Sequence, residues 1–92
     1  MITGTLRIRL IVREARTLKD KRQVLQSIKE KVRQSFNVSV AEIEDQNNPR
    51  SIVLGFAMVS NEAHPIKQTL GEIVNALKAH PIAEFVDHEM EV

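Results

Sequence analysis

The stretch TLRIRLIVR, from Thr5 to Arg13, alternates apolar and polar side chains, with Ile11 as the exception. Because successive side chains of a strand point to opposite faces, this pattern predicts a strand with one buried face. The buried face is expected to carry Leu6, Ile8, Leu10 and Val12, and the other face Thr5, Arg7, Arg9, Ile11 and Arg13. The strand therefore needs a covering layer on one side only.

The next segment, TLKDKRQVLQSIKEKVRQSFN from Thr17 to Asn37, has the apolar spacing of an amphipathic helix. Thr17 is a residue type that caps helix N-termini, and Asp20 follows at the distance of a capping box. The expected buried stripe is Leu18, Leu25, Ile28, Val32 and Phe36. We predict a helix that begins after Thr17 and packs this stripe against the strand.

A second amphipathic helix is predicted between Asn61, its expected N-cap, and Pro81. Pro65 falls in the first turn, where an amide proton has no partner within the helix. The apolar stripe of this helix is Ala63, Ile66, Leu70, Ile73, Val74 and Leu77. Both helices thus have one face suited to cover a sheet.

The remaining strands are expected in NVSVAEIE (37–44), SIVLGFAMVS (51–60) and EFVDHEMEV (84–92). Because the strand 51–60 is apolar on both sides, its helix-facing set stays open. That set is either Ile52, Leu54, Phe56 and Met58 or Val53, Gly55, Ala57 and Val59. The last strand is expected to point Val86, His88, Met90 and Val92 inward.

The order strand, helix, strand, strand, helix, strand predicts an α+β two-layer sandwich of ferredoxin-like topology over residues 1–92, as a single domain. The four-stranded antiparallel sheet has two helices on one face, and its last strand lies beside its first. Arginines 7, 9 and 13 would then face acids of the last strand across the open side of the sheet. Those acids are Asp87, Glu89 and Glu91.

The composition is that of an ordinary soluble domain, with 42% hydrophobic and 27% charged residues among 92. There is no cysteine, which excludes disulfides and thiolate metal sites and fits a reducing compartment. The longest apolar run, Ile52 to Val59, is far shorter than the roughly 20 residues of a membrane span, and no signal peptide is visible. We expect a cytoplasmic protein.

The charge is divided unevenly along the chain, although the net charge is only +1. Before Asn37 there are ten Lys or Arg against three Asp or Glu, a balance of +7; from Asn37 onward there are three against nine, a balance of −6. Such asymmetry is typical of nucleic-acid-binding surfaces. The alternative is that the two halves neutralise each other within the fold.

The first helix carries a row of polar side chains beside its buried stripe, which we call the basic stripe: Lys19, Arg22, Gln26, Lys29 and Arg33. No acid is expected to interrupt it. At ~1.5 Å per residue it is about 21 Å long, which spans several phosphates of a nucleic-acid strand. It either contacts RNA phosphates or is only a solvated flank.

Three further cations are candidate contacts, namely Arg16, Lys21 and Arg50. Cations in the first turn of a helix are disfavoured by the helix dipole, and an anion bound at the free amides of that turn would reverse this. We therefore expect the turn that carries Lys19, Lys21 and Arg22, together with Arg16 of the preceding loop, to bind a phosphate group.

Nothing in the chain predicts an enzyme, a metal site, a cofactor or a small-molecule ligand. His64 and His80 bracket the second helix about 24 Å apart, so they cannot share a metal, and His88 is expected to be a core histidine. An acylphosphatase-like role for Arg16 lacks the glycine-rich phosphate cradle.

With three Phe and no Tyr or Trp, base stacking on the sheet is not expected. An apolar open face suits homodimerisation instead.

Several segments resemble the YlxP-like family, small bacterial proteins grouped as domain of unknown function 503. The most specific are TLKDKR (Thr17–Arg22) and FNVSVAE (Phe36–Glu42), with GFAMVSNEAH and HPIAEFVDHEMEV further on. The resemblance covers nearly the whole chain. It implies the βαββαβ fold, a bacterial cytoplasmic setting and genes that often neighbour transcription and translation factors. RNA or ribosome association is therefore expected, without catalytic residues.

The chain departs from many members of that family in the turn from Gln46 to Arg50. Relatives often carry a Trp before an Arg in this turn, whereas this chain reads QNNPR. Arg50 keeps the matching basic position and remains a possible contact with RNA.

Overall fold

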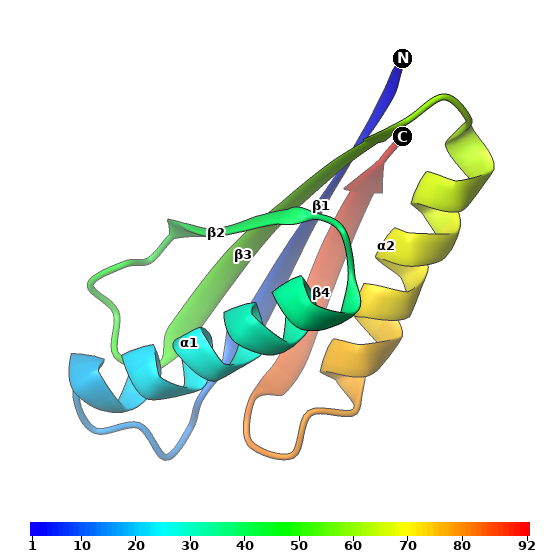
Figure 1. The fold of residues 1–92 in the computed structure, drawn as a ribbon. Helices are drawn as coiled ribbons and strands as arrows, with labels where there is room; N and C mark the ends of the chain where they lie inside the picture. Colours follow the sequence, from blue (N-terminus) through cyan, green and yellow to red (C-terminus); the bar gives the residue numbers. More distant parts are fainter.

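A computed structural model describes all residues from 1 to 92. Its elements follow the predicted order, and their bounds are β1 (Ile2–Ile11), α1 (Leu18–Ser35), β2 (Ser39–Glu44), β3 (Ser51–Ser60), α2 (Ala63–Lys78) and β4 (Glu84–Glu91) (Figure 1). The two termini lie near each other at one end of the sheet. No helix is both long and apolar enough to cross a membrane.

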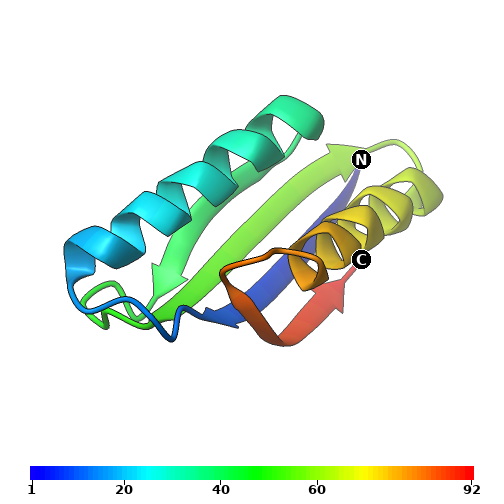
Figure 2. The same cartoon turned by 90° about the horizontal axis from the view of Figure 1, so that it is seen from below.

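The strands form one antiparallel sheet in the order β2-β3-β1-β4, and both helices pack against the same face (Figure 2). This is the predicted ferredoxin-like arrangement. The central strands β1 and β3 are paired along their whole length, from Ile2 opposite Ser60 to Ile11 opposite Ser51. The strands β2 and β4 form the two edges.

The core lies between the sheet and the helices, and it settles which face of β3 is inward. Ile52, Leu54 and Phe56 are buried in the core cluster with Leu6, Ile8 and Leu10 of β1. The helices contribute their predicted apolar stripes, among them Leu25, Ile28 and Val32 of α1 and Ile66, Leu70 and Ile73 of α2. The alternate residues of β3 therefore line the open face of the sheet.

Gly4 of β1 lies directly beneath α2. A Cβ atom at this position would meet Ile66 Cγ2 at 2.2 Å, which no packed structure tolerates. The absence of a side chain at Gly4 thus lets α2 approach the start of the sheet closely.

The N-terminus of α1 has the predicted capping box. Thr17 Oγ1 accepts a hydrogen bond from the Asp20 amide at 3.2 Å, and the Asp20 carboxylate accepts one from the Thr17 amide at 3.2 Å. The prediction for α2 was wrong by one residue, because its N-cap is Glu62, not Asn61. Ser60 Oγ accepts the Glu62 amide at 3.2 Å and so turns the chain before the helix begins.

The inward pattern predicted for β4 is corrected by a register shift between Arg9 and Leu10 of the neighbouring strand. Phe85, not Val86, pairs with Leu10 and packs on the core, while Val86 is 44% exposed. His88 lies opposite Ile8 but is exposed, since β4 is an edge strand. The prediction of a core histidine was therefore wrong.

Candidate nucleic-acid interface

The strand arginines are paired with acids on the open face of the sheet. Arg7 lies 3.2 Å from Glu89, as predicted for neighbouring strands β1 and β4. Arg13 forms a two-pronged pair with Glu84, an acid of β4 that was not among the predicted partners, and this contact lowers the pKa of the Glu84 carboxyl from its usual range. These cations are therefore neutralised within the fold.

Arg9 takes partners outside β4, whereas the prediction placed its partners among the acids of that strand. Its backbone lies opposite Asp87 in the register with β4, yet its guanidinium lies 3.5 Å from Asp45 and 3.9 Å from Glu44 on the opposite side. The end of β2 and the turn after it supply these acids. The third arginine is thus also paired, and Asp87 has no cation within 4 Å.

Lys21 is completely buried, so the prediction that it contacts RNA is corrected. Its ammonium donates hydrogen bonds to the carbonyl oxygens of Asp45, Gln46 and Ser51, at 2.8, 3.1 and 3.3 Å. The same nitrogen lies 3.0 Å from Glu42 Oε2, which has no hydrogen bond of regular geometry and relies on this ion pair. Lys21 holds the β2–β3 turn against α1 instead of facing solvent.

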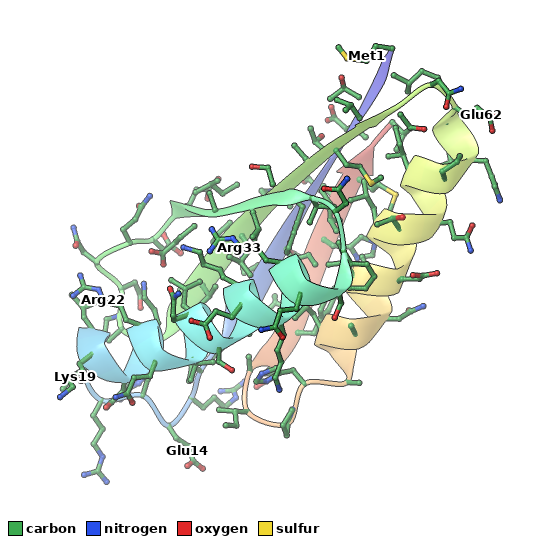
Figure 3. The ribbon with its side chains drawn as sticks, viewed as in Figure 1. Met1, Glu14, Lys19, Arg22, Arg33 and Glu62 are labelled. Atoms are coloured by element: carbon green, nitrogen blue, oxygen red, sulfur yellow. The ribbon has the colours of Figure 1, made fainter.

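The basic stripe keeps four cations without a carboxylate within 4 Å. Lys19 and Arg22 are exposed and project from the first turns of α1 (Figure 3). Arg33, on the last turns, points toward β2 and donates to the Val40 carbonyl at 3.4 Å. Lys29 lies between them and is half-buried. The stripe thus starts at exposed cations on the first turns of α1 and ends at Arg33, which reaches edge strand β2.

No acid interrupts the basic stripe, but Glu30 borders it. Gln26 Nε2 donates a hydrogen bond to Glu30 Oε1 at 3.2 Å. Because residues four apart are neighbours on a helix surface, the carboxylate stands next to the amide of the stripe. Glu30 therefore lowers the positive potential at the middle of α1.

An acid of the chain itself lies at the first turn of α1, where the sequence predicted a bound anion. The Asp20 carboxylate accepts the Arg16 amide at 2.9 Å as well as the Thr17 amide. The bond from the Arg16 amide is the main reason why the pKa of Asp20 is lowered. A negative group thus already balances the helix dipole near Lys19 and Arg22.

Arg50 joins the same end of the molecule through the β1–α1 loop. Its Nε donates to the Ala15 carbonyl at 3.1 Å, and its own carbonyl accepts the Val12 amide at 2.8 Å. Asn48 Oδ1 accepts the amides of Arg50 and Ser51 and shapes the turn. Arg50 therefore lies beside the loop that carries Arg16, at the N-terminal end of α1.

The surface of α1 bears a shallow hollow of about 650 Å³. It is lined by Lys19, Arg22, Gln23, Leu25, Gln26, Ser27 and Glu30. Gln23 and Ser27 were not among the predicted contacts, because the prediction considered cations only. Their four-residue spacing, which places Gln23 beside Lys19 and Ser27 beside Gln23 on the helix surface, was the signal that could have identified them.

The histidines do not form a site. No three His, Asp or Glu side chains gather as metal ligands require. His80 has a structural contact instead: its Nδ1 accepts the amides of Ile82 and Ala83 at 3.1 and 3.0 Å. Burial, followed by the nearby Lys31 ammonium, lowers the pKa of His80.

A comparison with family models matches residues 3–90 to the family described as Protein of unknown function (DUF503). The match covers nearly the entire chain. The protein belongs to the DUF503 family. No curated protein matches the chain. The description of the DUF503 family names no activity.

Proposed function

We propose that this DUF503 protein is a non-enzymatic, RNA- or ribosome-associated protein of the bacterial cytoplasm. It binds the phosphate backbone through the basic stripe of α1, with Arg16 and Arg50 as additional contacts at the N-terminal end of the helix. Binding needs no cofactor. It has little sequence preference, since phosphate contacts position a protein without reading bases.

The observation that supports this function is that the cations paired with carboxylates and the unpaired cations lie in different parts of the fold. Of the ten Lys and Arg before Asn37, four lie within 4 Å of a carboxylate, namely Arg7, Arg9, Arg13 and Lys21. The six others are Arg16, Lys19, Arg22, Lys29, Lys31 and Arg33. All six stand on α1 or in the loop before it. In the folded protein, the unpaired positive charge of this half of the chain is therefore concentrated on α1 and the loop before it.

The test is retention of RNA by the purified protein and co-sedimentation of the protein with ribosomes, each at low and at high salt. A variant in which Lys19, Arg22, Lys29 and Arg33 are all replaced by Glu is expected to lose binding. Because each phosphate contact adds about 0.7–0.9 to the slope of log affinity against log salt, the slope is expected to flatten. Unchanged retention in this variant would contradict the proposed interface.

A matched pair of variants separates the site from net charge. Lys19→Glu with Arg22→Glu alters the stripe at two exposed residues without an ion-pair partner. Lys67→Glu with Lys78→Glu makes the same change in net charge at exposed positions on α2, away from the stripe. The first pair is expected to weaken RNA binding by about tenfold or more and the second far less. Equal losses would point to a general charge effect.

A second candidate function is that of a structural or regulatory homo-oligomer that associates through the open sheet face. The observation in its favour is exposed apolar surface on β2 and β3, with Ile43 44% and Val59 59% exposed. A hollow of about 430 Å³ lies on this side, where the Ile43 side chain lies over Gly55.

Sedimentation velocity distinguishes the two functions. A dimer that is insensitive to salt, that does not migrate with RNA and that dissociates in the Val59→Glu variant would support the oligomer. A monomer that migrates with ribosomes at low salt and leaves them at high salt would support RNA binding.

A further inference from the structure

The structure also bears on the class of RNA, and this step rests on the proposed function. Proteins that bind single-stranded RNA stack unpaired bases on exposed aromatic side chains. The chain has three aromatic residues of the Phe, Tyr and Trp types, and all are Phe. Phe56 is 2% exposed in the core, and Phe36 and Phe85 pack against that core. None of the Phe rings lies on the open sheet face as a platform for bases.

The open sheet face also lacks a path for a single strand. Its arginines are occupied by Glu89, Glu44, Asp45 and Glu84, as described above. Asp87 and Glu91 on β4 have no cation within 4 Å, so they add uncompensated negative charge at that side. Phosphates are therefore repelled from the surface on which this type of sheet would splay out unpaired bases.

The hollow on α1 has a different chemistry. Next to the cations Lys19 and Arg22 it presents uncharged hydrogen-bonding groups, the amides of Gln23 and Gln26 and the hydroxyl of Ser27. In the pair with Glu30, Gln26 uses its Nε2 as donor, which leaves its Oε1 free to accept a hydrogen bond. The surface thus combines phosphate-binding cations with acceptors and donors suited to a hydroxyl.

Double-stranded RNA displays this combination in its wide, shallow minor groove, where 2′-hydroxyls lie between two rows of phosphates. We propose that α1 binds A-form RNA duplex across the minor groove. Lys19 and Arg22 contact phosphate groups, and Gln23, Gln26 and Ser27 contact 2′-hydroxyls. Because helix α1 presents these groups on a rigid surface, recognition is by shape and sugar rather than by sequence.

Glu30 limits the strength of this contact. It is the one carboxylate lining the hollow, and its hydrogen bond holds the Gln26 amide. A phosphate or ribose at the middle of α1 meets this charge. Glu30→Gln removes the charge and keeps a partner for Gln26, so the affinity for duplex RNA is expected to rise about two- to tenfold.

The experiment measures fluorescence anisotropy of the full chain with a labelled RNA duplex, a DNA duplex of the same sequence and one of the RNA strands alone. The wild-type protein is expected to bind the RNA duplex tightest. The double variant Gln23→Ala/Gln26→Ala is expected to lose about three- to tenfold for duplex RNA, with less change for duplex DNA and no change in salt slope. Gln68→Ala, at an exposed position on α2, is the matched control and leaves binding unchanged.

The outcomes separate this inference from the proposed function. If the single strand or the DNA duplex binds as tightly as the RNA duplex, the minor-groove contact is wrong while phosphate binding by α1 stands. If the glutamine variant weakens RNA and DNA duplexes equally, the assignment to 2′-hydroxyls is wrong. If none of the nucleic acids binds at low salt, both the inference and the proposed function are overturned.

Discussion

The Lys21 ammonium lies 3.0 Å from a Glu42 carboxylate oxygen beneath the turn that joins β2 to β3. The Lys21 side chain is fully buried, and that of Glu42 is 16% exposed. The ammonium also binds three carbonyl oxygens of this turn and its flank, which consumes its hydrogen-bonding capacity. A cation from the most basic segment of the chain is thus part of the interior.

Replacing Lys21 by Met is expected to destabilise the protein by about 3–5 kcal/mol, because Glu42 and the turn carbonyls lose their buried partner. Urea unfolding measures this loss as a lower midpoint. Lys31→Met, at an exposed position on the same helix, is the control and is expected to change stability by less than about 0.5 kcal/mol. A loss below about 1 kcal/mol for Lys21→Met would contradict the role of this ion pair.

The sequence predicted what depends on local periodicity. The alternation of Leu6, Ile8 and Leu10 and the helical spacing of Leu25 and Ile28 lead to the observed core, because burial of one face is dictated by the repeat of each element. The order of elements, with short connections, then left the ferredoxin-like topology as the simplest arrangement.

What could not be predicted depends on contacts between distant segments. The burial of Lys21 arises from a turn 24 or more residues further along the chain. The partners of Arg9 follow from the positions of Glu44 and Asp45 at the end of β2, which periodicity does not reveal. Phe85 packs on the core because the pairing of β4 with β1 shifts by one residue between Arg9 and Leu10, which interrupts the inward–outward alternation of side chains along β4.

A pair of glycines offers a sharp test of packing. Gly4→Ala is expected to destabilise the protein by about 1–3 kcal/mol, because the added Cβ would collide with Ile66 Cγ2 beneath α2. Gly71→Ala has no atom within 4 Å of the new Cβ and lies inside a helix, so it is expected to stabilise by about 0.5–1 kcal/mol. Thermal unfolding of both variants should move the melting temperature in opposite directions. A Gly4→Ala variant as stable as the wild type would refute the close approach at Gly4.

The stability of the protein is expected to depend on pH through His80. Its Nδ1 can accept the amides of Ile82 and Ala83 only when that nitrogen carries no proton, and the pKa of His80 in the folded protein is lowered from 6.5. The unfolded chain then binds more protons than the folded one below that value. The contribution is fully present above pH 6.5 and is lost as the pH falls through the folded pKa.

Urea unfolding at several values between about pH 5 and pH 8 measures this dependence. The His80→Ala variant is expected to lose about 0.5–1.5 kcal/mol at pH 8, where the acceptor is intact in the wild type, and to show a smaller change with pH. His64→Ala, at an exposed position, is the control. If His80→Ala keeps the same difference from the wild type at every pH, titration of His80 does not affect folding.

The capping box of α1 is expected to contribute to the stability of the protein and to the loss of that stability at low pH. Thr17→Ala removes the hydroxyl that accepts the Asp20 amide and is expected to cost about 0.5–2 kcal/mol. The pKa of Asp20 is lowered mainly by the bond from the Arg16 amide, so the benefit of its charge is present above its unfolded value, about 3.9, and disappears as the pH falls through the folded value. Asp20→Asn should therefore be less stable than the wild type at pH 7, and the difference in stability should shrink as the pH falls through the lowered pKa of Asp20. If the difference in stability between Asp20→Asn and the wild type is the same at every pH, the carboxylate charge has no part in the cap.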